Sequence, residues 1–157
     1  MRNLLEKTHL IFHCEPYGSA STRYKKSWKY FFATSSLRHV LNQDLDNPIQ
    51  NQKAYEGILL ENFIASTLFN LKNRKNLKFK LFYDPKSKNK NVDFLIKKET
   101  NKPIPIEVSI GENNKKQILS SMKRYKSDYG IIIANNFHSI KKDGNVIYVP
   151  LKTFSFL

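Results

Sequence analysis

The part of the sequence that most constrains the fold runs from residue 104 to residue 134. Ile104–Ile110 alternates apolar and other side chains with the period of two that a strand requires. Ile131–Ala134 is an uninterrupted apolar run, typical of a strand in the middle of a sheet. A segment with helical character, which ends near Ser127, separates the two. A strand, a helix and a second strand in this order close as a right-handed parallel crossover, so the segment predicts a sheet with parallel strands.

The residues before this crossover predict a helix followed by antiparallel strands. Ala54–Leu71 places apolar side chains at steps of three and four, which indicates an amphipathic helix. Lys78–Tyr83 and Val92–Ile96 are predicted strands, and polar turns connect them to each other and to the crossover. Val146–Val149 adds a last strand. The sequence therefore predicts an α/β fold with a mixed sheet flanked by helices.

The N-terminal segment predicts a short helix end and two strands. Asn3–Lys7 can end a helix, and the strands are predicted at His9–Cys14 and Trp28–Phe32. The polar stretch Ser19–Lys26 between them is predicted to be a loop. Helix end, strand, basic loop and strand is the order of the last part of a winged-helix domain. A plain hairpin that packs its aromatic side chains on the following domain fits this segment equally well.

A polar stretch separates the N-terminal segment from the rest of the chain. Thr34, Ser35 and Ser36 offer N-caps for a short helix over Leu37–Leu41. Asn42–Asn51 then has the composition of a linker. We therefore predict a winged-helix remnant over residues 1–45 and a main domain over residues 52–157.

The charge of the chain points to an anionic partner. The 157 residues include 27 Lys and Arg against 13 Asp and Glu, which gives a formal net charge of +14. Such an excess attracts polyanions, most often nucleic acid, and we expect DNA. A lysine-rich composition also follows from the coding bias of an AT-rich genome, so a solvated basic surface is the alternative.

Half of the excess charge lies in one segment. The segment from Lys72 to Lys90 contains eight Lys or Arg residues and a single acidic residue, Asp84. Basic runs also occur in the N-terminal loop and in the helix of the crossover. The predicted nucleic-acid contacts come from these three places, and they are Arg23, Lys25, Lys26, Lys86, Lys88, Lys90, Lys123, Arg124 and Tyr125.

The sequence also predicts the compartment. Cys14 is the only cysteine, so no internal disulfide forms, which suits a reducing cytoplasm. No signal-peptide pattern follows Met1, and no apolar run reaches the ~18 residues of a membrane span. We expect a cytoplasmic protein with no membrane partner. The sequence leaves open whether the chain forms a homodimer.

Three acidic residues lie where apolar patterning would not place them. Glu107 shares a strand face with Ser109, opposite the apolar side chains of the same strand. Asp93 interrupts the preceding strand, and Glu61 lies on the apolar stripe of the long predicted helix. Buried carboxylates that converge are stabilised by a divalent cation, so the three predict a site for Mg²⁺ or Mn²⁺ that could activate water against a phosphodiester. A strand end for Asp93, and ion pairs for Glu61 and Glu107, are the alternatives.

The order of these residues resembles a known pattern. A glutamate in a helix, then a Val-Asp-Phe strand, then an Ile-Glu-Val strand resembles the PD-(D/E)xK nuclease superfamily, which implies a restriction-endonuclease-like fold. Over nearly the whole chain the sequence looks like the C-terminal domain of unknown function of many archaeal and bacterial AAA-type ATPases. The segments that carry this likeness are Leu4–Phe12, Pro16–Tyr17, Lys29–Phe32, Tyr55–Phe63, Asn91–Leu95 and Pro105–Val108.

The resemblance implies roles for the matching positions. Glu61, Asp93 and Glu107 match the acidic residues that ligate the metal, and they would have to converge within about 6 Å to share one ion. Ser109 stands where the family has its catalytic lysine. A serine hydroxyl carries no charge, so it cannot replace a lysine that stabilises charge on the phosphate. The resemblance with this replacement implies a nucleic-acid-binding domain with weak or lost metal-dependent hydrolysis.

Two alternatives stay open. An active magnesium-dependent DNA endonuclease would need a relocated lysine, for which Lys97, Lys98 and Lys102 are candidates. A non-catalytic interaction domain would instead assemble with an AAA-type ATPase module. This chain has no Walker A loop of its own, so the resemblance implies a short form or the C-terminal part of such a protein.

Overall fold

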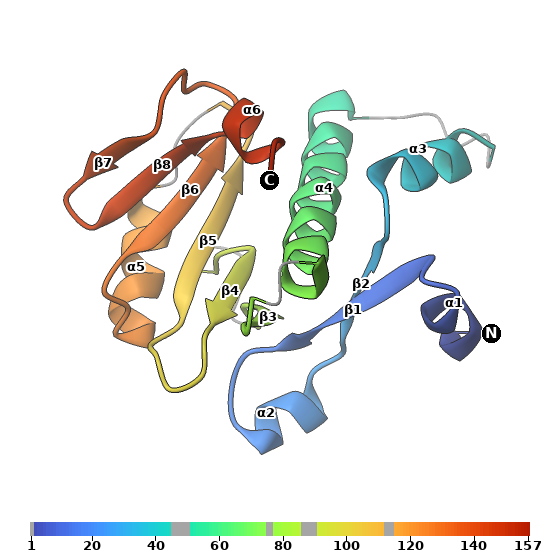
Figure 1. Cartoon of the computed structure of the whole chain (residues 1–157), viewed down its shortest axis with the longest axis horizontal. Helices are drawn as coiled ribbons and strands as arrows, with labels where there is room; N and C mark the ends of the chain where they lie inside the picture. The colour runs from blue at the N-terminus through green and yellow to red at the C-terminus, as the bar shows by residue number, and fades with distance from the viewer. Residues whose placement is uncertain (1, 45–50, 75–76, 86–90, 112–114) are drawn as a thin grey trace.

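A computed structural model describes residues 2–44, 51–74, 77–85, 91–111 and 115–157. In this part of the chain, eight strands form one sheet in the order β2-β1-β3-β4-β5-β6-β8-β7. Helices pack against the sheet, with α4 crossing the middle of the molecule (Figure 1). The predicted α/β fold, a mixed sheet flanked by helices, is confirmed.

The strands are β1 (Ile11–Pro16), β2 (Lys29–Phe32), β3 (Lys80–Tyr83), β4 (Phe94–Lys97), β5 (Ile104–Ser109), β6 (Gly130–Ala134), β7 (Lys141–Asp143) and β8 (Val146–Pro150). The helices are α1 (Arg2–Lys7), α2 (Ala20–Lys25), α3 (Ser35–Asp44), α4 (Gln52–Arg74), α5 (Lys115–Tyr125) and α6 (Leu151–Phe154). None of the helices in the described part of the chain combines the length and the apolar character needed to cross a bilayer.

The centre of the sheet follows the predicted pattern. β4 pairs antiparallel with both β3 and β5, and β5 pairs parallel with β6 through the crossover helix α5. β8 continues the parallel set beside β6, while β7 returns antiparallel to β8. The sequence did not predict β7 or α6, because the first spans three exposed residues and the second a single turn.

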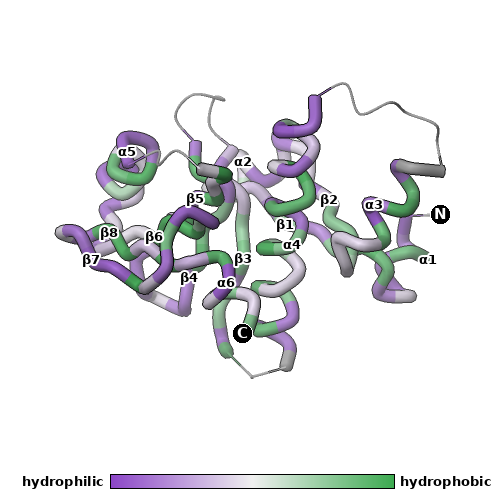
Figure 2. Tube along the Cα trace, turned by 90° about the horizontal axis from the view of Figure 1, so that it is seen from above, coloured by the Kyte–Doolittle hydropathy of each residue, from purple (hydrophilic) through white to green (hydrophobic). Residues whose placement is uncertain are grey.

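Each face of the sheet has its own core. On one face, Ile64 and Leu68 of α4 pack in the same cluster as Ile106 of β5. On the other face, Ile118 of α5 packs with Ile132 of β6. Figure 2 shows α5 and α6 on opposite sides of the strands. Alternate residues of β5 and β6 therefore belong to different cores, which decides where each polar side chain of these strands points.

The N-terminal strands extend the same sheet. β1 pairs antiparallel with β2 and parallel with β3, where Glu15 is the register partner of Phe82. Phe31 of β2 joins the core on the α4 side. The fully buried amide of Asn62 also connects α4 to β2, since its Oδ1 accepts from the Phe32 N–H at 2.9 Å and its Nδ2 donates to the Phe32 carbonyl at 3.0 Å. Among the described residues, the two predicted segments thus share one sheet and one core; residues 45–50 of the predicted boundary lie outside the described residues.

One local prediction is wrong. The stretch Ser19–Lys26, predicted to be a loop, contains the helix α2. The Ser19 hydroxyl accepts a hydrogen bond from the Thr22 N–H at 3.3 Å, as an N-cap does, and the residues after it include no proline or glycine that would stop a helix. A polar composition alone therefore did not exclude a short capped helix.

Candidate functional site

Glu61 and Asp93 border one small pocket. Glu61 lies in the middle of α4, and Asp93 directly precedes β4. The pocket has a volume of about 350 Å³, and Val108 and Ser109 at the end of β5 also line it. Burial first, and the negative charge of Glu61 second, raise the pKa of the Asp93 carboxyl. The structure therefore brings two of the three predicted carboxylates together, beside the serine at the position of the family lysine.

A lysine from the N-terminal part of the sheet reaches this acidic pair. Lys29 of β2 donates from Nζ to Oε1 of Glu61 at 3.0 Å, and the ammonium also lies 5.5 Å from the ring centre of Tyr83. The side chains of Lys29 and Glu61 are 42% and 26% exposed, so water partly screens the pair. The sequence predicted Lys29 as part of a strand, Trp28–Phe32, and did not indicate it as a site residue. The signal that could have found it is the missing lysine at position 109, which calls for a cation from elsewhere.

The pKa of Asp93 is shifted toward neutral pH. Burial is the first cause, and the charge of Glu61 is the second; both raise the pKa. The N–H of Val108, which donates to Oδ2 of Asp93 at 2.7 Å, and the ammonium of Lys29 act in the opposite direction. The balance raises the pKa of Asp93 to about 7. The pocket therefore gains a negative charge as the pH rises through neutrality.

Glu107 lies on the opposite face of the sheet. Its register partner in β6 is Ile132, which packs against Ile118 of α5. Its neighbours in β5, Ile106 and Val108, face the core on the α4 side. Period-two alternation therefore turns Glu107, which is 5% exposed, toward α5 and away from Glu61.

The donor set does not fit the three-carboxylate metal site that the resemblance implies. Among the described residues, no three His, Cys, Asp or Glu side chains are grouped so that they could hold one ion. Of the two carboxylates that meet, Glu61 is paired with Lys29, and Asp93 accepts a backbone hydrogen bond. The pocket thus offers two carboxylates, with Lys29 paired to one of them and Lys53 in its lining, and a bound Mg²⁺ or Mn²⁺ stays a prediction.

Two of the predicted nucleic-acid contacts take part in a buried network. Tyr125 donates from its hydroxyl to Oδ1 of Asp84 at 2.6 Å, and Arg124 donates to Oδ2 at 2.8 Å. Asp84 is buried at the end of β3, so these hydrogen bonds connect α5 to the sheet. The same arrangement raises the pKa of Tyr125, through burial first and the hydrogen bond to Asp84 second. Lys123, the residue directly before Arg124 in α5, is exposed.

The other predicted contacts differ in their surroundings. Arg23 of α2 lies 3.7 Å from Oε2 of Glu15, while Lys25 and Lys26 are exposed at the end of the same helix. The remaining predicted contacts, Lys86, Lys88 and Lys90, lie outside the described residues.

Lys97, Lys98 and Lys102 are the predicted candidates for a relocated lysine. None of them is among the described residues that line the pocket of Glu61. Lys102 donates to Oδ1 of Asp128 at 2.6 Å, Lys97 lines a different pocket, and Lys98 is exposed. Lys29 instead pairs with Glu61, and Lys53 also lines the pocket.

Comparison with known proteins places the chain in a family. Residues 56–154 match the family model described as "Domain of unknown function (DUF4143)". An uncharacterized protein of Methanocaldococcus jannaschii is 34% identical over 155 residues, which cover 99% of this chain and 31% of that protein. The chain thus spans about a third of the length of this curated relative. Since the family model matches more than half of its residues, the chain belongs to the DUF4143 family.

Proposed function

We propose that this chain is a nucleic-acid-binding domain with a restriction-endonuclease-like fold, in which metal-dependent phosphodiester hydrolysis is weak or lost. The order of elements from α4 to β6 supports the fold: a helix, three antiparallel strands, a helix and a parallel strand. This is the order in which the residues that resemble the PD-(D/E)xK superfamily follow one another. The net charge of +14 supports a polyanionic partner.

The observation that carries the loss of hydrolysis is the composition of the acidic pocket. Lys29 pairs with Glu61, Ser109 occupies the lysine position, and Glu107 faces the other side of the sheet. A site of this kind has fewer carboxylates for a cation than the superfamily pattern requires, and it places a positive charge on one of them. We therefore expect this chain to bind nucleic acid and to hydrolyse it weakly or not at all.

The experiment compares binding with cleavage on the same labelled DNA. Binding is expected at about 50 mM salt and should fall steeply by about 200 mM, because phosphate contacts release counterions. Incubation with Mg²⁺ or Mn²⁺ should give no more cleavage than incubation with EDTA, for the wild-type chain and for Asp93→Asn alike. The Asp93→Asn variant is the control for contaminating nucleases.

Efficient metal-dependent cleavage, with many turnovers per chain, that Asp93→Asn abolishes would overturn this proposal. It would establish the second candidate, an active magnesium-dependent DNA endonuclease, in which Lys29 beside Glu61 would serve as the relocated lysine. The absence of binding at low salt would remove both candidates and leave an interaction domain that assembles with an ATPase module.

A further inference from the structure

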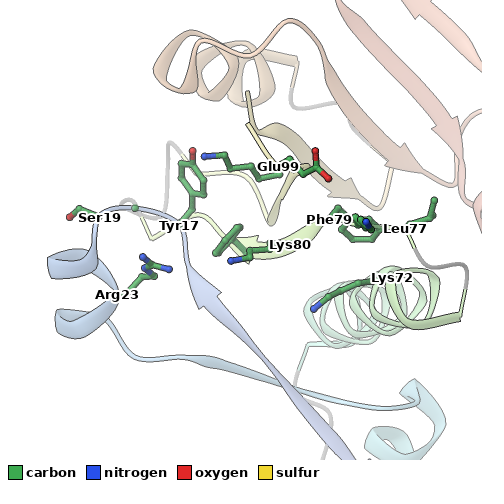
Figure 3. A pocket seen from close by; sticks show the side chains of 12 residues that line it. Tyr17, Ser19, Arg23, Lys72, Leu77, Phe79, Lys80 and Glu99 are labelled. Atoms are coloured by element: carbon green, nitrogen blue, oxygen red, sulfur yellow. The ribbon is translucent and has the colours of Figure 1, made fainter. Parts of the chain in front are cut away.

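A second and larger pocket lies among α2, the C-terminal part of α4, β3 and β4. Its volume is about 1160 Å³, and within the described chain it shares no lining residue with the pocket of Glu61 and Asp93. Figure 3 shows that Arg23, Lys72 and Lys80 approach it from three different elements. Typical small-molecule sites measure about 300–1,000 Å³. The size and the number of elements around it favour an extended ligand.

The pocket is strongly basic. Its lining includes five cationic side chains, which are Arg23, Lys72, Lys78, Lys80 and Lys97. Among the described lining residues, Glu99 is the one acidic side chain. Lys80 and Lys97 are direct register partners on β3 and β4, and like charges opposite each other destabilise a sheet. Within the described residues, none of the four lysines has a carboxylate at ion-pair distance. An anionic ligand would relieve this repulsion.

Apolar surface lies between these charges. Tyr17 and Phe79 are half-buried, Leu77 is 47% exposed, and Phe82 lies beneath them in the core. Tyr17 is held by edge-on contacts with the rings of Phe82 and Tyr125. A duplex presents phosphates on its outside and hides the faces of its bases. Cations interleaved with aromatic rings are instead typical of surfaces that bind single strands, because unpaired bases stack on the rings.

We infer that this pocket binds single-stranded nucleic acid, with phosphates on Lys80 and Lys97 and bases against Tyr17 and Phe79. The inference rests on the proposed function and adds to it the form of the nucleic acid and the surface that holds it. It places the binding surface apart from the pocket of Glu61 and Asp93, with which it shares no lining residue within the described chain.

The experiment measures binding of the full chain to a fluorescein-labelled oligothymidylate by fluorescence anisotropy. Lys80→Gln/Lys97→Gln is expected to weaken binding about 10-fold or more at low salt, and to reduce the slope of log affinity against log salt by about 1.4. Lys142→Gln/Lys152→Gln removes the same charge from exposed positions on β7 and α6, and it should change the affinity less than about 2-fold. Circular dichroism and urea unfolding check that both variants fold.

A stacking variant and a duplex complete the test. Phe79→Ala should weaken binding about 5-fold or more, because base–aromatic stacking is lost. A duplex of the same length should bind more weakly than the single strand. If the wild-type chain binds but the Lys80/Lys97 variant binds as well as its control, the inference fails and the proposed function stands, with nucleic acid bound elsewhere. A preference for duplex also overturns the inference, whereas a wild-type chain that binds neither probe overturns the proposed function itself.

Discussion

Replacing Lys29 by methionine removes the ammonium from the acidic pocket and keeps an apolar side chain of similar length. The ammonium lies 3.0 Å from Oε1 of Glu61. At that distance an ion pair is worth about 1–5 kcal/mol for effective dielectric constants of roughly 80 to 20. Because the Lys29 side chain is 42% exposed, the lower end of the range applies. We expect Lys29→Met to lower the free energy of unfolding by about 1 kcal/mol at pH 8.

The pH dependence of this loss follows from Asp93. Its pKa is raised to about 7 in the folded chain, against about 3.9 for an unfolded Asp. A raised folded pKa gives stability that is fully present below the unfolded pKa and is lost as the pH rises through the folded pKa. Lys29 is one of the causes that hold the pKa of Asp93 down, so its removal raises that pKa further. The difference between Lys29→Met and the wild type should therefore be larger at pH 8 than at pH 5.

Urea unfolding followed by the fluorescence of Trp28, the one tryptophan of the chain, measures both effects. Lys25→Met is the matched control, since Lys25 is exposed on α2, and it should change the stability by less than about 0.5 kcal/mol. In an Asp93→Asn background, the extra loss at pH 8 should vanish. Equal losses at pH 5 and pH 8, or a more stable Lys29→Met at pH 8, would refute the described coupling of these three side chains.

Four further predictions concern the fold around the site. Asn62→Ala should lower the free energy of unfolding by about 2–4 kcal/mol in urea, because it leaves the N–H and carbonyl of Phe32 without their buried partners; a loss below about 0.5 kcal/mol would argue against this contact. Gly130→Ala should cost about 1–3 kcal/mol, since its Cβ would lie 2.7 Å from Cγ1 of Ile118. Gly57→Ala in α4, where a Cβ meets nothing nearer than 4.0 Å, should instead stabilise the chain by up to about 1 kcal/mol in the same assay. The thiol of Cys14 should not react with Ellman's reagent in the folded chain, because burial raises its pKa to about 12; fast labelling without denaturant would contradict its buried position.

The sequence predicted the parts of the fold that local patterns encode. Period-two alternation in Ile104–Ser109 correctly indicated a strand, and the apolar run of β6 correctly indicated a central strand. The pattern does not state which helix covers which face of a sheet. For that reason the sequence could not show that Glu61 and Glu107 lie on opposite sides.

The part of the site that the sequence missed depends on long-range pairing. Lys29 reaches Glu61 because β2 pairs with β1 and β1 pairs with β3. Parallel pairing between segments far apart in the chain leaves no periodic signal in either segment. The sequence also did not predict the hydrogen bonds of Asp84 with α5, because Asp84 is 40 or more residues away from Arg124 and Tyr125 in the chain.

The pairing of β1 with β3 also covers a strand edge and an aromatic side chain of the core. The stretch that matches the family model begins at residue 56, so a chain shortened to that stretch would lack β1 and β2. β3 would then be an outer strand with unpaired N–H and carbonyl groups, and such edges template the addition of further strands from other molecules. The ring of Phe69 in α4, which stacks on Phe12, would be uncovered as well. The N-terminal strands therefore cover β3 and the ring of Phe69, and β2 becomes the outer strand on that side of the sheet.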